Sequence, residues 1–148
     1  MTKDVILSIS GLQFFGEEDA SPVKIITAAT YYNKHGKHYL LYDEVLEGFQ
    51  DITKNIIKLK NDSLDISKKG IANVDMLFEK NKRNITYYNT PYGSFYIGIH
   101  ASNIKMTETE DDIDVEVDYA LEINHEHAAD CKIKMNIHSK EAKNFKLL

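Results

Sequence analysis

The stretch DIDVEVDYALEI, residues 112–123, decides the fold class because apolar and acidic side chains alternate along it. The apolar members are Ile113, Val115, Val117, Tyr119, Leu121 and Ile123, and the acidic members are Asp112, Asp114, Glu116, Asp118 and Glu122. A period of two places the apolar side chains on one face of a β-strand and the acids on the other. The stretch therefore predicts a strand with one face in the core and one face in water.

Similar alternation recurs along nearly the whole chain, in short segments separated by turn signals and without a clear amphipathic helix. We expect strands over residues 4–15, 23–33, 37–45, 52–60, 64–68, 73–80, 84–90, 94–106, 113–123 and 130–138. Asn33-Lys34-His35-Gly36 predicts a tight hairpin turn, since glycine tolerates the positive φ that such turns need. Between residues 94 and 106 the apolar phase slips, which predicts a β-bulge near Ser102-Asn103.

The last two expected strands have matching charge rows. Residues 130–138 direct Cys131 and the apolar residues after it to one face, and Lys132 and Lys134 to the other. If the two apolar faces join the same core, the lysines lie beside the acids of residues 112–123. Such cross-strand pairs contribute roughly 0.2–1 kcal/mol each and help to define the register. The single cysteine then becomes a small core residue.

Ten short antiparallel strands in 148 residues leave two architectures, a two-sheet sandwich and a closed barrel. Hairpin-length connections between nearly all neighbours favour an up-and-down meander, which closes most simply as a barrel. We therefore expect an all-β, single-domain, lipocalin-like antiparallel barrel of about 8–10 strands. The barrel domain covers residues 1–138, and residues 139–148 form a tail that is either a short helix or a frayed end.

Composition and charge exclude several function classes. The net charge of −5 and the single arginine, Arg83, argue against binding to a nucleic acid backbone or to guanine edges. No apolar run approaches the length of a membrane span, and the first residues lack the features of a secretory signal. One cysteine fits a reducing compartment, so the expected location is the cytoplasm.

Catalytic and metal-binding motifs are weak. His125-Glu126-His127 lies close to Asp130 and Cys131, which allows a metal site, but the segment is better interpreted as the turn between the last two strands. The serines stand outside any nucleophile elbow, and no glycine-rich loop opens a helix. We expect no catalytic residue, no metal and no cofactor.

The most unusual placement is Lys68, which shares a strand face with Leu64 and Ile66. An inward Lys68 would need a carboxylate or phenol partner, and Glu44 or Tyr42 could supply one. The alternative is that Lys68 sits at a strand end and extends its ammonium group into water. The nine tyrosines are the other chemical resource, because their apolar bodies and polar tips suit either an amphipathic ligand or a subunit interface. The candidate ligand contacts are Tyr42, Glu44, Lys68, Tyr88 and Thr90.

Several segments together resemble the YwiB-like family of bacterial proteins, whose function is uncharacterised. They are Tyr31-Tyr32-Asn33-Lys34 with Tyr39-Leu40-Leu41-Tyr42-Asp43-Glu44, Thr53-Lys54-Asn55-Ile56-Ile57-Lys58, Met76-Leu77-Phe78, Tyr88-Asn89-Thr90-Pro91-Tyr92-Gly93 and Asp118-Tyr119-Ala120-Leu121. The resemblance extends over nearly the whole chain and implies a calycin-like or lipocalin-like barrel, without assigning an activity. The chain departs from secreted lipocalins in lacking tryptophan, and it has Lys68 where the family leads us to expect arginine.

Two functional hypotheses follow, and they belong to different classes. The first is non-catalytic binding of a small amphipathic ligand inside the barrel. The second is an interaction module, such as a homodimer, with a barrel filled by its own side chains and a tyrosine-bearing outer face. An interior cavity of roughly a few hundred Å³ with converging polar groups favours the first hypothesis, and a filled interior with a large exposed apolar patch favours the second.

Overall fold

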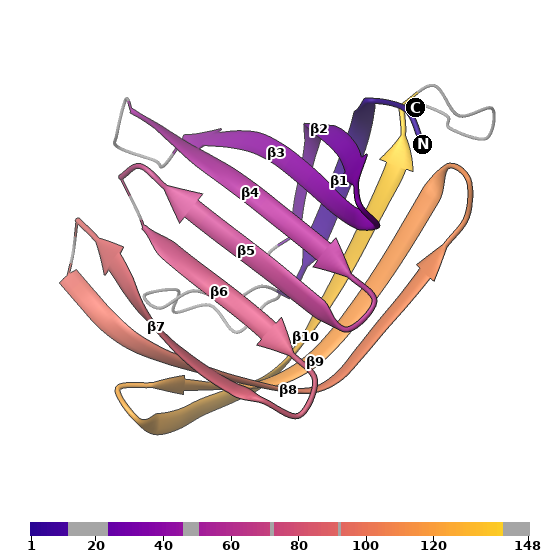
Figure 1. Ribbon diagram of the computed structural model, residues 1–148. Coiled ribbons are helices and arrows are strands. Elements are labelled where there is room, and N and C mark those ends of the chain that lie inside the picture. The colour runs from indigo at the N-terminus through magenta and orange to yellow at the C-terminus, as the bar shows by residue number, and fades with distance from the viewer. Residues whose placement is uncertain (12–23, 46–50, 72, 92, 141–148) are drawn as a thin grey trace.

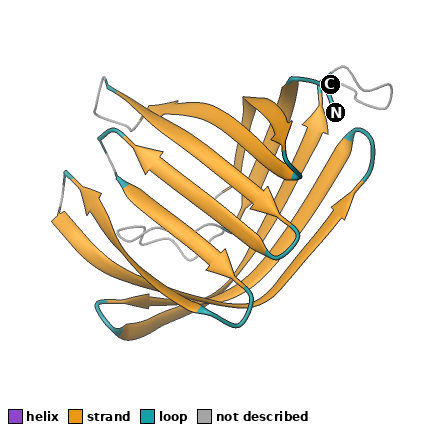
Figure 2. Ribbon diagram, in the orientation of Figure 1, coloured by secondary structure: helices purple, strands orange, loops and turns teal. Residues whose placement is uncertain are grey.

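Ten antiparallel strands make up the computed structural model of the chain, which describes residues 1–11, 24–45, 51–71, 73–91 and 93–140. The strands are β1 (Asp4–Ser10), β2 (Lys24–Lys34), β3 (Lys37–Val45), β4 (Ile52–Lys60), β5 (Ser63–Lys69), β6 (Val74–Glu79), β7 (Arg83–Thr90), β8 (Gly93–Glu108), β9 (Asp112–Ile123) and β10 (Glu126–Ser139). Within the described ranges every regular element is a strand (Figure 2), and so no helix there could cross a membrane.

All ten strands belong to one sheet, in the order β6-β5-β4-β3-β2-β1-β10-β9-β8-β7. Each strand forms a ladder with its neighbours in the chain except between β6 and β7, and β1 also pairs with β10, from Val5 opposite Ser139 to Ser10 opposite Lys134. The sheet curls until its two edge strands, β6 and β7, lie side by side (Figure 1). A single curled sheet confirms the barrel and rules out the sandwich.

The barrel closes along the seam between β6 and β7 by a few specific bonds. Asn73 and Asn89 exchange both backbone hydrogen bonds, at 2.8 and 2.9 Å. Further along the seam, the side-chain amide of Asn84 donates to the carbonyl oxygen of Leu77 at 2.9 Å. The backbone N–H of Asn81 donates to the carbonyl of Ala101 on β8 at 2.8 Å. The seam is therefore closed by fewer backbone pairs than the strand ladders elsewhere.

The inner face of the sheet carries one continuous apolar core, as the alternating pattern requires. Among its largest wholly buried side chains are Leu7, Ile9, Leu40, Ile57, Phe78 and Ile99. Cys131 is also buried, which confirms its expected place in the core. Most of the barrel interior is thus occupied by the chain's own side chains.

The outer face of β8, β9 and β10 confirms the predicted charge rows. Glu116 on β9 lies between Lys134 on β10 and Lys105 on β8, and Lys132 lies opposite Asp118. The Lys132 ammonium is 3.7 Å from the Asp118 carboxylate. The predicted bulge is present as a register shift between Ala101 and Asn103. These cross-strand pairs of opposite charge stabilise the observed pairing of the three strands.

Most strand boundaries agree with the sequence prediction to within one or two residues, and the main correction concerns β10. This strand begins at Glu126 rather than at residue 130, because the turn consists of Asn124 and His125, which both have positive φ. A register shift between His127 and Ala129 then restores the apolar phase, which hid the extra residues from the alternation.

The β2–β3 turn and the C-terminal end of the barrel domain can also be compared with the sequence prediction. Gly36, with φ of 79°, makes the predicted β2–β3 turn together with His35. Ser139 is fully buried and still belongs to β10, one residue beyond the expected end of the domain. The expected strand residues 12–15, the loop at 16–22 and the tail at 141–148 lie outside the described residues.

Candidate functional site

A band of polar side chains crosses the inner face of β3, β4 and β5 near one end of the barrel. Tyr42 lies opposite Asn55, and Asn55 lies opposite Lys68. One pair further along, Glu44 lies opposite Thr53. We refer to Tyr42, Glu44, Thr53, Asn55 and Lys68 as the polar layer. All of them except Glu44 are at most 6% exposed, although the strands that carry them are otherwise apolar on this face.

The centre of the polar layer is an ion pair between Lys68 and Glu44. The Lys68 Nζ lies 2.7 Å from Glu44 Oε1, with the lysine 4% and the glutamate 25% exposed. Lys68 therefore points into the barrel, and Glu44 is the partner that an inward lysine requires. The alternative in which the ammonium group extends into water is wrong. The Glu44 carboxylate offsets part of the desolvation cost of burying this charge.

Three buried polar atoms of the polar layer have no hydrogen-bond partner among the described residues. They are Tyr42 Oη, Thr53 Oγ1 and Asn55 Oδ1. The nitrogen of the Asn55 side-chain amide does have partners. Nδ2 donates to the carbonyl oxygen of Thr53 at 3.4 Å and to Glu44 Oε1 at 3.5 Å. Buried polar groups without partners are uncommon and costly in folded proteins, so these three atoms single out the polar layer as the candidate site.

Electrostatics at the polar layer disfavour negative charge. Burial raises the pKa of Tyr42 well above its usual value, and the neighbouring Glu44 carboxylate raises it further. The Tyr42 phenol therefore stays protonated and remains able to donate a hydrogen bond. The same carboxylate would repel an anion brought to this hydroxyl group.

Gly70 allows the chain to turn tightly against the polar layer. Its φ is +152°, and a Cβ atom at this position would lie 2.8 Å from both the Ile52 carbonyl oxygen and Thr53 Cα. No larger residue fits so close to the β4 backbone. The close approach holds the end of β5, and with it Lys68, against Thr53 and Asn55.

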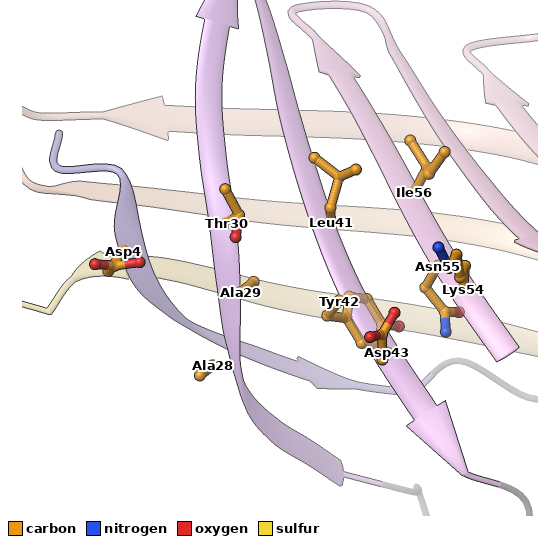
Figure 3. Close-up of a pocket in the computed structure, with 10 residues that line it drawn as sticks. All are labelled: Asp4, Ala28, Ala29, Thr30, Leu41, Tyr42, Asp43, Lys54, Asn55 and Ile56. Carbon is orange, nitrogen blue, oxygen red and sulfur yellow. The ribbon is translucent and has the colours of Figure 1, made fainter. Parts of the chain in front are cut away.

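The polar layer borders a cleft where β2 and β3 separate. Their pairing runs only from Lys34 opposite Lys37 to Thr30 opposite Leu41, after which the two strands diverge. A cleft of about 530 Å³ lies at this point, and Figure 3 shows its lining along β1 to β4. This β2–β3 cleft is lined by Asp4, Ala28, Ala29, Thr30, Leu41, Tyr42, Asp43, Lys54, Asn55 and Ile56. It combines apolar side chains and the charged residues Asp4, Asp43 and Lys54 with two members of the polar layer.

The other two candidate contacts lie further from the cleft. Tyr88 is buried on β7, and the Asn73–Asn89 bridge brings it next to Val74, the cross-strand partner of Lys68. Thr90 is half-buried, and its hydroxyl donates to the carbonyl of Gly93 within its own hairpin at 2.9 Å. The structure thus brings Tyr42, Glu44 and Lys68 together, places Tyr88 across the seam, and leaves Thr90 in a turn.

Sequence reasoning missed Thr53 and Asn55. The signal was available, because both share the strand phase of Ile57 and Leu59, which predicts an inward direction on β4. A polar residue in the inward phase of a strand is as informative as Lys68. It was overlooked because neither residue is charged.

A second buried polar group, at His38, was also missed. Tyr31 Oη lies 2.6 Å from His38 Nδ1, and His38 Nε2 lies 3.5 Å from Glu108 Oε1. Burial is the main reason why the pKa of Tyr31 is raised. These contacts satisfy both ring nitrogens of a histidine that is 4% exposed and tie the β2–β3 hairpin to the end of β8.

The histidine-rich segment before Cys131 is strand and turn rather than turn alone. Glu126 and His127 belong to β10, and His127 Nε2 lies 3.3 Å from Asp130 Oδ1. Within the described ranges, no three His, Cys, Asp or Glu side chains gather closely enough to hold a metal ion. Burial raises the pKa of the Cys131 thiol, as expected for a core cysteine.

The fold and the polar layer define a class of protein, namely an antiparallel, nearly closed β-barrel with a polar cleft in its wall. The family described as Domain of unknown function (DUF1934) matches residues 7–135. Since the match covers most of the chain, this protein belongs to that family.

Comparison with solved structures supports the same assignment. The chain is similar to the ywiB protein from Bacillus subtilis, with a TM-score of 0.74 and 17% sequence identity. The similarity covers 93% of this chain and 92% of the other. At this identity the likeness establishes a common fold, which confirms the expected YwiB-like barrel. Among curated proteins no match was found.

Proposed function

We propose that this protein binds a small amphipathic molecule without catalysing a reaction on it. The polar end of the molecule contacts Tyr42 and Asn55 in the polar layer, and its apolar part lies along the β2–β3 cleft. Glu44 and Lys68 contribute by holding the polar layer in place, and Tyr88 borders it from β7.

The observation that carries this proposal is the group of three buried polar atoms, at Tyr42, Thr53 and Asn55, for which the described part of the chain supplies no hydrogen-bond partner. Two of these residues, Tyr42 and Asn55, also line the cleft. Ala28, Ala29 and Leu41 supply apolar contact surface beside them. Binding sites for small molecules usually combine mostly apolar walls with a few converging polar groups.

Native mass spectrometry of the protein isolated from its own cells tests this proposal. We expect a retained small molecule on the wild-type chain and its loss from Ala28→Trp, which places a large ring on an exposed wall of the cleft. The matched control is Ala128→Trp, at an exposed position of β10. A wild-type chain that carries no added mass, or an Ala28→Trp chain that retains it in full, would contradict the proposal.

A second candidate is self-association through the outer face of β7 and β8. Ile85 and Tyr87 on β7 are about half exposed, and Tyr96 on β8 stacks against both Tyr87 and His125. Exposed aromatic residues of this kind are enriched in protein interfaces. Sedimentation velocity would support this candidate if the wild type were dimeric and Tyr87→Ser with Tyr96→Ser monomeric. A monomeric wild type would remove it.

A further inference from the structure

We infer that the molecule bound in the β2–β3 cleft has an uncharged head group that donates at least one hydrogen bond, as an alcohol or a primary amide does. This inference rests on the proposed binding function and adds the chemical class of the ligand. It depends on which hydrogen-bonding capacities the polar layer has left, and on how its charges balance.

The Asn55 carbonyl oxygen sets the requirement for a donor. Its orientation follows from its neighbours, because the amide nitrogen faces the Thr53 carbonyl and the Glu44 carboxylate, which only accept. A flipped amide would direct its oxygen at a carboxylate. Asn55 Oδ1 is therefore the atom that lacks a partner, and it can only accept. A bound group must bring a hydrogen to it.

The hydroxyl groups of Tyr42 and Thr53 complete the requirement. Each hydroxyl group can donate one hydrogen bond and accept others, and both are buried without a partner among the described residues. A head group that donates to Asn55 and accepts from Tyr42 would satisfy the unpartnered atoms of the two polar-layer residues that line the cleft. Alcohols and primary amides have both capacities, whereas carboxylates at neutral pH lack the hydrogen for Asn55.

Charge balance excludes ionic head groups. Lys68 and Glu44 already form an ion pair at 2.7 Å, so a charged head group beside Tyr42 and Asn55 would be buried close to both of these charges. An anion would lie near the Glu44 carboxylate, and a cation would lie near the Lys68 ammonium group. Desolvation of an uncompensated charge is more costly than that of a neutral hydrogen-bonding group.

A series of amphiphiles with the same tail and different heads tests the inference by isothermal titration calorimetry. Octanamide and octanol are the neutral donors, octanoate and octyl phosphate are the anions, and octylammonium is the cation. We expect the neutral probes to bind the wild type at least about tenfold more tightly than any charged probe, and Ala28→Trp to abolish their binding.

Tyr42→Phe tests whether the head group reaches the polar layer, because it removes the hydroxyl group and keeps the ring. We expect octanamide and octanol to bind about three- to tenfold more weakly, the loss typical of one hydrogen bond. The matched control is Tyr32→Phe, which removes a hydroxyl group from an exposed tyrosine outside the cleft and should leave affinity unchanged. Thr53→Val is a second variant that removes a buried hydroxyl group, here from the Glu44–Thr53 pair next to Tyr42 and Asn55 on the inner face.

The outcomes separate the two claims. If octanoate or octyl phosphate binds as tightly as octanamide and Ala28→Trp still abolishes binding, the head-group inference is wrong and the binding function stands. Equal affinity of Tyr42→Phe and wild type for the neutral probes would also overturn the inference. If no probe binds the wild type more tightly than Ala28→Trp, then the polar layer holds ordered water only, and both claims fail.

Discussion

At the scale of single residues, the unpartnered hydroxyl groups suggest a conflict between stability and function. Tyr42→Phe and Thr53→Val each remove a buried polar atom that lacks a partner among the described residues. We expect each variant, free of ligand, to raise the free energy of unfolding by about 0.5–2 kcal/mol. Urea denaturation would measure the change. A loss of stability comparable to that of a broken hydrogen bond would show that these hydroxyl groups have structural roles instead.

The Lys68–Glu44 pair should behave as a buried ion pair. Glu44→Gln removes the carboxylate beside a nearly buried ammonium group, and we expect the free energy of unfolding to fall by about 2–4 kcal/mol. The double variant Lys68→Met with Glu44→Gln removes both charges, and it should therefore recover part of this loss. Chemical denaturation of the two single variants and the double variant measures the coupling energy.

A surface pair provides the control for that experiment. Lys82 and Glu79 lie 3.5 Å apart, with the lysine 66% exposed, so their coupling should be below about 1 kcal/mol. If the Lys68–Glu44 coupling were no larger than the Lys82–Glu79 coupling, Lys68 would not be held in the barrel by its charge.

The carboxyl groups of Asp65 and Asp75, on the outer face of β5 and β6, give a pH-dependent prediction. Ser67 Oγ lies 3.4 Å from Asp65 Oδ1 and 3.0 Å from Asp75 Oδ1. Burial, followed by the hydrogen bond and the charge of Asp75, raises the pKa of Asp65 from 3.8 to about 7. The pKa of Asp75 is lowered, mainly by the hydrogen bond with Asp65.

Because the folded protein holds the Asp65 proton more tightly than the unfolded chain does, the stability from this group falls as pH rises from about 4 to about 7. Asp65→Asn should remove about 1 kcal/mol of that fall, a value reduced for solvent screening. Urea denaturation across this range would measure it, with exposed Asp62→Asn as the control. The same pH slope in wild type and Asp65→Asn would contradict the prediction.

At the scale of structural elements, the β6–β7 seam has fewer backbone hydrogen bonds between its described residues than the strand ladders have. Asn84→Ala removes the amide that donates to the Leu77 carbonyl, and we expect a loss of about 1 kcal/mol. Hydrogen exchange should then accelerate mainly in β6 and β7, since the other ladders stay intact. Asn61→Ala, in the exposed β4–β5 turn, is the control. Uniform acceleration over all strands would show that the seam does not open by itself.

The elements also show how far sequence reasoning reaches. Bounds for β3 and β4, the bulge after Ala101 and the charge rows of β9 and β10 all follow from alternation, which is a local property. The start of β10 does not follow from alternation, because a second register shift, between His127 and Ala129, hides the apolar phase. The separation of β2 from β3 after Thr30 is a property of how the sheet closes, and alternation within one strand carries no information about it.

At the scale of the whole molecule, the candidate site could be predicted only in part. Lys68 and Glu44 were recognisable because charges in an inward strand phase require a partner. The pairing of Tyr42 with Asn55, and their position at the β2–β3 cleft, depend on the register of three strands and on closure of the barrel. The family and the related fold of the ywiB protein identify the architecture and leave its ligand open.

The central claim is that the polar layer is completed by a small organic molecule rather than by the chain itself. A high-resolution crystal structure of the protein isolated from its own cells tests it most directly. We predict electron density in the β2–β3 cleft for an organic molecule within hydrogen-bond distance of Tyr42 Oη and Asn55 Oδ1. Density at these two atoms that is fully explained by water, or by side chains of this chain, would contradict the account.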